Sequence, residues 1–230
     1  MNKKIAGFPY LRLRKQKTRD HIARIEVASD SMRVGKTTAV KVMGEGLRKK
    51  GYKVTESYED WEHNPYLKQS YVDPAKNFLD SQKWFIQRKF EQLRDGGVGN
   101  VFIQDVAPET DYCYAETNRR LGRMSEDHFN LYDEFYRSLD WNLVPAPDLM
   151  VYLSVSDNEL IKRATESKRE FERVEPDYFL MMKRVNREWM DKFSNSQILF
   201  VDTDELDFAN DPKAKERLVE MVMKRLQRVE

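Results

Sequence analysis

The stretch that most constrains the fold runs from Arg24 to Thr38, where an apolar run leads through a polar turn into a helix-forming segment. Its Gly35-Lys36-Thr37 matches the last three positions of the phosphate-loop pattern G-x-x-x-x-G-K-[ST]. In that pattern, N–H groups at a helix start face an anion, the lysine reaches the outer phosphates, and the hydroxyl contacts Mg²⁺. Asp30 replaces the first glycine, and a carboxylate beside a phosphate site is unfavourable. The stretch predicts a phosphate site, with a chance Gly-Lys-Thr as the alternative.

Short β-rich runs alternate with longer helical patterns along the chain. Apolar runs such as Val101-Phe102-Ile103 are typical of strands buried on both faces of a parallel sheet. The alternation predicts right-handed crossovers and an α/β fold with a five-stranded parallel sheet flanked by helices. The predicted strands are Ile25–Ser29, Lys53–Tyr58, Val101–Val106, Leu149–Val155 and Ile198–Asp202. The predicted helices are Lys36–Lys50, Pro74–Arg94, Tyr112–Leu121, Ser125–Leu139, Asn158–Ser167, Pro176–Phe193 and Pro212–Leu226.

Charge and composition narrow the kinds of partner. The 230 residues include 40 Lys and Arg against 39 Asp and Glu, so no overall field draws the chain to nucleic acid or to a membrane surface. No stretch approaches the roughly 18 apolar residues of a membrane span. Cys113 is alone, which excludes a disulfide framework within the chain. We expect a cytoplasmic protein with a basic N-terminal arm over residues 1–22 and one folded domain over residues 23–230.

Ligands of such a sheet bind at the carboxyl ends of its strands. The first end is the phosphate loop, and acidic side chains follow two further strands at Glu56 and Asp105. Beside a phosphate loop, one carboxylate can hold Mg²⁺ or its water shell and another can accept the proton of an attacking hydroxyl. Asp157 and Asp204 also follow strands, and on pattern alone they are interpreted as turn formers and helix caps. The pattern favours phosphoryl transfer, with Glu56 and Asp105 in functional roles.

A mixed-charge segment follows the fourth predicted strand, over about residues 162–174. It contains Lys162-Arg163 and Lys168-Arg169-Glu170-Phe171-Glu172-Arg173. Such a run is often only a solvated helix face. In a phosphate-loop kinase, arginines at this place close over the transferring phosphoryl group and neutralise its developing charge. We therefore predict a lid here.

With these residues in place, the chain resembles the deoxynucleoside kinase family from about Arg24 to Phe208. Members carry Glu-Pro-Val-x-x-Trp after the second strand, and the segment from Glu56 to Trp61 keeps the glutamate and the tryptophan at the same separation. Asn64-Pro65-Tyr66-Leu67 is also similar to the family. The resemblance implies a three-layer P-loop kinase fold.

The resemblance also implies roles for the matching residues. On the acceptor nucleoside these are Glu56 as general base for the 5′-hydroxyl, Trp61 as a wall, Tyr71 and Glu172 on the sugar 3′-hydroxyl, and Gln82, Lys89 and Asp111 near the base. On the donor side, the residues implied around the phosphates of ATP are Arg33, Val34, Gly35, Lys36, Thr37 and Thr38. Asp204 would lie in the segment over the adenine. Arg163 and Arg169 would act with Lys36 as catalytic cations of the lid. Thr37 would contact Mg²⁺, with Asp105 behind it.

Departures from the family pattern bear on activity. Val106-Ala107 stand where the family has Arg-Ser, which removes a cation expected to contact the base carboxylate and the reacting oxygen. Ser167 replaces a lid arginine, and Arg33 occupies a position that is small in the family. Losing one transition-state cation can lower the rate by several orders of magnitude. Arg33, or an arginine from elsewhere, is a candidate substitute.

The leading hypothesis is a kinase that moves the γ-phosphoryl group of ATP, with Mg²⁺, to the 5′-hydroxyl of a deoxynucleoside. Two alternatives stay open. One is a noncatalytic nucleotide-binding or scaffold relative, which the departures favour. The other is a nucleoside monophosphate kinase, in which Lys89 or Arg88 would bind the acceptor phosphate. The resemblance further implies a homodimer formed through long helices such as Pro74–Arg94 and Ser125–Leu139.

Overall fold

The computed structural model describes residues 22–192 and 198–227. Residues 1–21 of the predicted basic arm, and Phe193 at the predicted end of a helix, lie outside the described residues. The predicted strands are confirmed, with bounds that differ by at most two residues. They are β1 Ala23–Ser29, β2 Val54–Ser57, β3 Val101–Asp105, β4 Leu149–Ser154 and β5 Ile198–Asp202.

The strands form one parallel sheet in the order β2-β3-β1-β4-β5. β1 is central, and its Ile25 pairs with Ile103 of β3 and with Leu149 of β4. All three side chains are buried. A strand covered on both faces needs apolar residues on both faces, which is why these runs are continuous rather than alternating. The predicted α/β fold class is confirmed.

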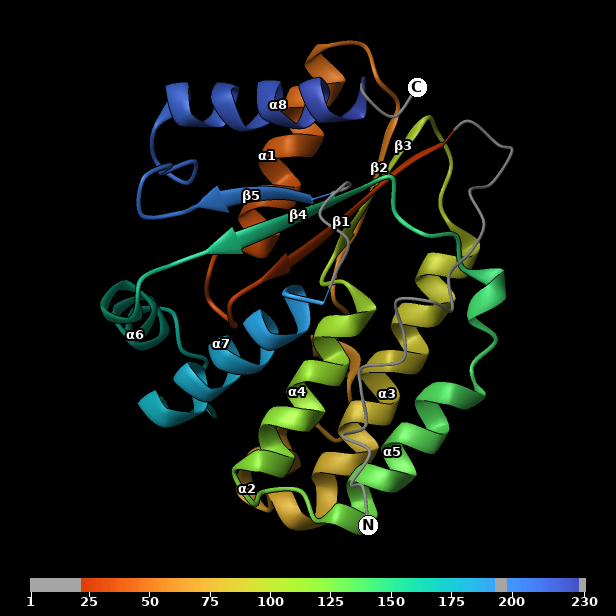
Figure 1. Ribbon diagram of the computed structural model, residues 1–230, viewed down its shortest axis with the longest axis vertical. Helices are drawn as coiled ribbons and strands as arrows, with labels where there is room; N and C mark the ends of the chain where they lie inside the picture. The colour runs from red at the N-terminus through yellow and green to blue at the C-terminus, as the bar shows by residue number, and fades with distance from the viewer. Residues whose placement is uncertain (1–21, 193–197, 228–230) are drawn as a thin grey trace.

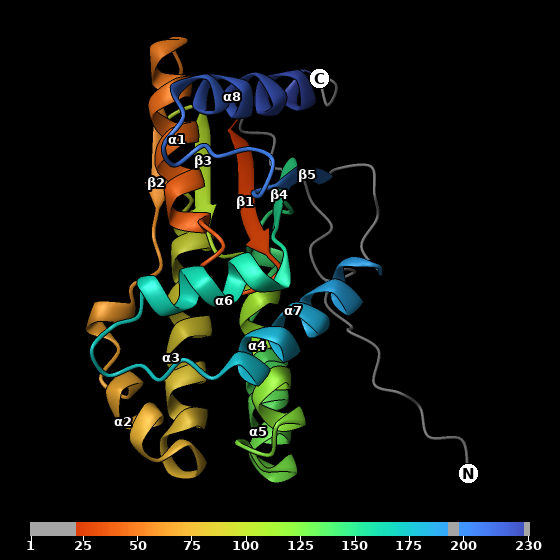
Figure 2. The same ribbon diagram turned by 90° about the vertical axis from the view of Figure 1, so that its left-hand side faces the viewer.

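Helices cover both faces of the sheet (Figure 1). They are α1 Lys36–Lys49, α2 Leu67–Val72, α3 Pro74–Asp95, α4 Pro108–Arg120, α5 Glu126–Ser138, α6 Asp157–Glu166, α7 Pro176–Met190 and α8 Pro212–Leu226. In Figure 1, α1 and α8 lie above the sheet, α3, α4, α5 and α7 lie below it, and α6 lies near the arrowheads of β4 and β5. Figure 2 shows that α3, α4 and α5 extend beyond the ends of the strands. The lower helices therefore form a layer that reaches past the sheet edge.

Two differences from the sequence prediction have local causes. α4 begins at Pro108, earlier than the predicted Tyr112, because proline fits the first helical position, where its missing N–H is not needed. The segment after β2 contains α2 and a 3-10 turn over Trp61–His63, both too short to give a clear periodic pattern. Among the described residues, no helix is both long enough and apolar enough to cross a bilayer.

The carboxyl ends of the central strands meet at one edge of the sheet. The register places Val27 of β1 beside Asp105 of β3, and Ser29 of β1 beside Leu153 of β4. The segments that leave β1, β3 and β4 therefore start side by side. This edge is where the candidate site lies.

Candidate active site

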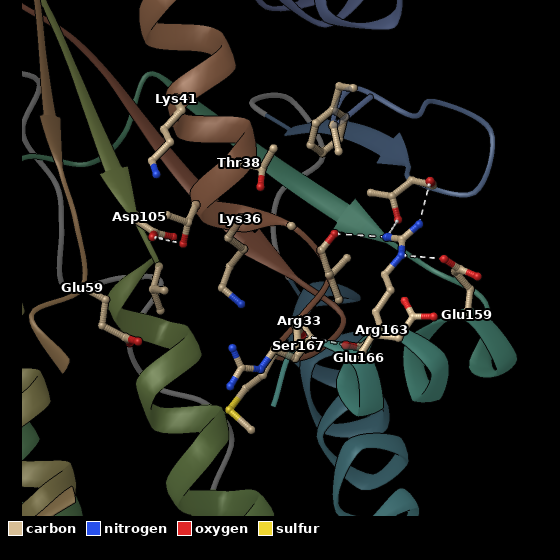
Figure 3. A pocket seen from close by; sticks show the side chains of 18 of the residues that line it. Arg33, Lys36, Thr38, Lys41, Glu59, Asp105, Glu159, Arg163, Glu166 and Ser167 are labelled. Carbon is tan, nitrogen blue, oxygen red and sulfur yellow. Dashed lines mark hydrogen bonds and ion pairs between the residues drawn. The ribbon is translucent and has the colours of Figure 1, made fainter. Parts of the chain in front are cut away.

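A large pocket opens at the carboxyl edge of the sheet (Figure 3). Its walls come from the phosphate loop, the exits of β2 and β3, α6 and the loop after β5. Its volume of ≈ 1430 Å³ exceeds the roughly 300–1,000 Å³ of a site for one small molecule, so two substrates can fit. Predicted residues that line it are Arg33, Val34, Gly35, Lys36, Thr37, Thr38, Trp61, Asp105, Arg163, Arg169 and Asp204. The other predicted residues, Glu56, Tyr71, Gln82, Lys89, Asp111 and Glu172, are not among those that line it.

The loop between β1 and α1 has the geometry of an anion site. Gly35 and Arg33 both have left-handed backbone, with φ of 110° and 65°. Lys36 opens α1, whose N-terminus has no side-chain cap, so its first N–H groups are available to an anion. Lys36 Nζ donates to the loop carbonyl of Ser31 at 3.0 Å. Burial lowers the pKa of Lys36, while Asp105 acts in the opposite direction. A phosphate can replace the loop oxygens as the lysine's partner.

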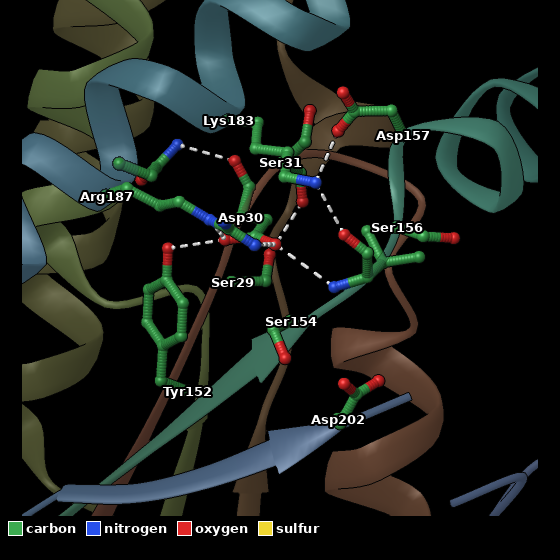
Figure 4. A network of polar contacts seen from close by, with 12 residues as sticks. Ser29, Asp30, Ser31, Tyr152, Ser154, Ser156, Asp157, Lys183, Arg187 and Asp202 are labelled. Atoms are coloured by element: carbon green, nitrogen blue, oxygen red, sulfur yellow. Dashed lines mark hydrogen bonds and ion pairs between the residues drawn. The ribbon is translucent and has the colours of Figure 1, made fainter. Parts of the chain in front are cut away.

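Asp30 lies behind the phosphate loop rather than beside the anion (Figure 4). Its carboxylate is fully buried and accepts two hydrogen bonds from the Arg187 guanidinium, both at 2.9 Å. The Tyr152 hydroxyl and the Val155 N–H also donate to it, each at 3.0 Å. Asp30 does not line the pocket. The expectation that this side chain would repel a phosphate is therefore wrong, because its charge is paired and turned toward β4 and α7.

Thr37 and Asp105 meet as the sequence suggests. The Thr37 hydroxyl donates to Asp105 Oδ2 at 2.6 Å, which leaves the lone pairs of the hydroxyl oxygen available to a cation. Asp105 Oδ1 is buried and has no hydrogen-bond partner among the described residues. Burial raises the pKa of Asp105, while the Thr37 hydrogen bond and Lys36 lower it. An oxygen without a partner beside a hydroxyl is a suitable place for a hard cation or its water.

The structure turns Glu56 away from the pocket, contrary to the predicted role. Glu56 Oε1 lies 2.6 Å from Arg48 Nη1 of α1, and the Tyr58 hydroxyl donates to Glu56 Oε2. The carboxylate also fills the space over Gly44, where an added Cβ would lie only 1.8 Å from Oε1. Side chains alternate along a strand, so Glu56 shares the α1 face with Val54 and Tyr58, which pack on that core.

Glu59, which the sequence analysis does not predict as a site residue, is an acidic side chain of this strand exit that enters the pocket together with Asp60 and Glu62. It lines the pocket, where it faces Lys36 and lies on the same side as Asp105 (Figure 3). Lys89 Nζ lies 3.7 Å from Glu59 Oε1. The strand alternation was the available signal, because it assigns Glu56 to the helix-covered face and leaves Glu59 beyond the strand end.

A buried ion pair lies beside Glu59, and a further polar residue is buried on the same helix as its lysine. Lys89 of α3 forms an ion pair with Asp111 of α4, with Nζ and Oδ2 2.6 Å apart. Burial raises the pKa of Asp111 to about 6, against the lowering effect of Lys89. Gln82 is also buried on α3, and its Oε1 has no hydrogen-bond partner among the described residues. A buried amide oxygen without a partner can serve the polar edge of a ligand.

The lid segment reaches over the pocket from α6 to α7. The Arg169 guanidinium carbon lies 3.9 Å from the centre of the Trp61 ring, so the lid touches the exit of β2. Arg169 Nη1 lies 2.7 Å from Glu172 Oε1, and Arg33 of the phosphate loop pairs with the same carboxylate. Burial raises the pKa of Tyr71, and the nearby Glu172 adds to the rise. The structure thus brings together Trp61, Tyr71, Arg169 and Glu172 as predicted, and adds Arg33.

Arg163 lies on the side of the loop after β5. Its Nη1 donates to Thr203 Oγ1 at 2.8 Å, its Nη2 donates to Thr203 O at 3.1 Å, and its Nε donates to Glu159 at 2.9 Å. Asp204 lines the same region and accepts a hydrogen bond from the Ser156 N–H. Arg163 therefore joins α6 to this loop, and its Nη1 also donates to Val34 O of the phosphate loop at 3.4 Å. Further lining residues that the sequence reasoning missed are Lys41, Tyr114, Phe208 and Asn210.

Three of the positions that depart from the family pattern carry no cation, namely Val106, Ala107 and Ser167. Val106 is buried, lines the pocket and has φ of 69°. Ala107 is buried and its N–H donates to Val27 O at 2.9 Å. The Ser167 hydroxyl donates to the carbonyl of Arg163 at 2.6 Å and closes the last turn of α6. These residues have structural contacts that explain their presence without a phosphate ligand.

The chain is similar to known proteins over most of its length. Residues 30–227 match the family described as deoxynucleoside kinase. A deoxyguanosine kinase of Lactobacillus acidophilus is 24% identical over 212 residues, which cover 88% of this chain and 91% of the relative. A deoxyadenosine/deoxycytidine kinase of Bacillus subtilis is 26% identical over 193 residues, which cover 82% of this chain and 87% of the relative. A deoxyadenosine kinase structure from M. mycoides with bound dATP has the same fold, with a TM-score of 0.70, 22% identity, and coverage of 89% of this chain and 99% of that one.

Proposed function

The chain belongs to the deoxynucleoside kinase family, and we propose that it uses Glu59 as the general base when it transfers the γ-phosphoryl group of ATP to a deoxynucleoside. Membership of the family makes the protein a deoxynucleoside kinase. One observation supports this proposal: Glu59, Lys36 and Asp105 face the same pocket (Figure 3).

The transfer needs one proton acceptor and several groups that stabilise phosphate charge. Glu59 accepts the proton of the 5′-hydroxyl as the oxygen attacks the γ-phosphorus. Lys36 exchanges its bond to Ser31 O for phosphate oxygens. The amides of the loop and of the α1 start bind the same phosphates. ADP then leaves from the side of the pocket lined by Thr203 and Phe208.

The acceptor side is assigned to the segment behind Glu59. Trp61 and Tyr71 flank the sugar, Glu172 of the lid lies near Tyr71, and Arg169, the partner of Glu172, lies over Trp61. The unpaired Oε1 of Gln82 and the Lys89–Asp111 pair supply polar groups for the base. The family resemblance supports these roles.

The residues present fit a magnesium ion. Mg²⁺ is usually held by one or two protein oxygens together with phosphate oxygens and water. The Thr37 hydroxyl and Asp105, with its unpaired Oδ1, offer such a set. When bound, the ion would neutralise charge on the phosphates of ATP. We therefore retain the proposal that Thr37 is a ligand and that Asp105 lies behind it.

Asp105→Asn tests the magnesium proposal. An amide holds the Thr37 hydroxyl less well than a carboxylate and removes a charge, so the half-saturating Mg²⁺ concentration is expected to rise about 10–100-fold. Mg²⁺ titrations of the initial rate at saturating ATP measure this change. Asp157→Asn is the matched control, because Asp157 of α6 pairs with Lys183 of α7 and is not among the residues that line the pocket. An unchanged Mg²⁺ dependence in Asp105→Asn would contradict the assignment.

The activity itself is tested with ATP and each of the four deoxynucleosides in an assay coupled to ADP formation. We expect turnover with at least one of them and a loss of about 10²–10³-fold in Lys36→Ala, since one donor to the developing charge is removed. Turnover no higher than that of Lys36→Ala would contradict the function. Tight binding of Mg-ATP without turnover would support the noncatalytic alternative, and a preference for monophosphates as acceptors would support the monophosphate kinase.

Two further expectations stay proposals. A homodimer through α3 and α5 follows from the family resemblance, and sedimentation at several protein concentrations would test it. A role in deoxynucleoside salvage follows from the same resemblance, and a cytoplasmic location stays the expectation from composition.

A further inference from the structure

The exit of β3 provides no positively charged side chain to neutralise the negative charge that develops during phosphoryl transfer. Val106, 2% exposed, and the fully buried Ala107 occupy this exit and are both apolar. A β-branched residue at positive φ is strained, so the Val106 backbone is held in this shape by its surroundings. Negative charge that develops on the transferring group must then be neutralised from another side of the pocket.

Arg33 faces the pocket from a backbone that disfavours side chains. Its φ of 65° is a conformation in which glycine fits without strain, yet an arginine stands there. Strained residues of this kind cluster at functional sites. The Arg33 side chain lines the same pocket as Lys36 and Val106, and Figure 3 shows Arg33 and Lys36 reaching the same part of it. A cation is thus placed on the phosphate loop itself.

The partners of Arg33 leave it able to bind an anion. Its Nη2 pairs with Glu172 Oε2, and Arg169 donates to the same carboxylate through its N–H at 2.9 Å and through Nη1 at 2.7 Å. Two guanidinium groups against one carboxylate leave an excess of positive charge. A guanidinium has five N–H donors in a fixed fork, so Arg33 can keep Glu172 and also contact phosphoryl oxygens.

We propose that Arg33 is a catalytic residue that binds the transferring phosphoryl group, in place of the arginine missing at position 106. The proposal rests on the function proposed above. The acceptor O5′ forms a bond to the γ-phosphorus while the bond from that phosphorus to the bridging oxygen of ADP breaks, and the hydroxyl proton passes to Glu59. Arg33 donates N–H bonds to the γ-oxygens as their charge changes. Arg163 is not available to bind the phosphoryl group, because its guanidinium donates hydrogen bonds to Thr203.

The test compares Arg33→Gly and Arg33→Gln with wild type. Glycine suits the backbone at this position, so the fold of Arg33→Gly is expected to survive, as thermal melting will show. We expect kcat to fall about 10³-fold in both variants, near the lower end of the effect of an arginine that stabilises phosphoryl transfer. The KM for ATP is expected to change by less than about fivefold, since the lost contact belongs to the transition state. Arg184→Gln is the control for a lost charge, because Arg184 is 71% exposed on α7.

A binding measurement separates transition-state stabilisation from simple ATP binding. Affinity for ADP with aluminium fluoride and the acceptor should fall in Arg33→Gly by a factor close to the loss in kcat, while affinity for a non-hydrolysable ATP analogue should change little. Equal losses in both affinities, or a kcat within about threefold of wild type, would overturn the proposal. A wild-type protein inactive on all deoxynucleosides would overturn the proposed function as well, whereas an active wild type with unaffected Arg33 variants overturns only the role of Arg33.

Discussion

Replacing Glu59 by Gln is expected to lower kcat by about 10²–10⁴-fold, the usual contribution of a general base. The amide keeps the size of the side chain but cannot take the proton of the attacking hydroxyl. Glu59 lines the pocket with Lys36 and Asp105, so the loss should fall on kcat, with little change in the KM for either substrate. Steady-state kinetics with ATP and the best deoxynucleoside measure both constants.

Glu56→Gln is the matched control, since it makes the same chemical change three positions earlier on the same strand exit. Its kcat is expected to stay within about threefold of wild type, because Glu56 is bound to Arg48 and Tyr58 on the α1 side. Arg48 is half exposed, so the lost pair should lower the free energy of unfolding by no more than about 1 kcal/mol. The reverse result, with Glu56→Gln inactive and Glu59→Gln active, would show that the spacing of the family motif identifies the base correctly.

Asp30→Gly, which restores the glycine of the phosphate-loop pattern, is expected to damage the protein. The change leaves the buried Tyr152 hydroxyl and the Val155 N–H without their acceptor and removes the partner of Arg187. Each buried group left unsatisfied costs about 1–3 kcal/mol, so we expect a loss of about 3 kcal/mol or more in the free energy of unfolding. For a domain of this size the melting temperature should fall by roughly 6–12 °C.

Asp30→Asn provides the graded comparison. Its side-chain oxygen can still accept from Tyr152 or Val155, but the charge opposite Arg187 is gone, so its melting temperature should lie between those of wild type and Asp30→Gly. Thermal melting with and without ATP measures the stability and the nucleotide response of each variant. If Asp30→Gly melts at or above the wild-type temperature, the contacts of Asp30 do not stabilise the phosphate loop, and the prediction is contradicted.

The fold could be predicted from the sequence because its signals are local. Runs such as Val101-Phe102-Ile103 and the glycine-lysine-threonine start of α1 depend on neighbouring residues, and the order of strands and helices follows from them. Trp61, Asp105 and Thr37 line the pocket, and each lies at a strand exit or a helix start, where the sequence predicts the site. The register of the parallel sheet then brings these exits together without further information.

The misplaced residues depend on contacts between distant parts of the chain. Asp30 was judged by its place in a motif, but its partners Tyr152 and Arg187 are more than a hundred positions away. The motif spacing to Trp61 predicts Glu56 as the general base. The direction of the Glu56 side chain, however, is set by its ion pair with Arg48 of α1. A motif fixes which residue types occur near a site. Packing decides which of two nearby carboxylates enters it.

β2 lies at the edge of the sheet, and its four residues are all only partly buried, whereas β3 is buried throughout. Short edge strands open more readily than central ones, so the amide protons of β2 should exchange with solvent sooner than those of β3. Glu59 follows this edge strand, and Asp105 ends the buried one. The proposed proton acceptor thus follows a strand that opens readily, while the proposed magnesium ligands lie at a buried strand. Enlarging the range of accepted nucleosides should therefore be easier through changes around β2 than through changes around β3.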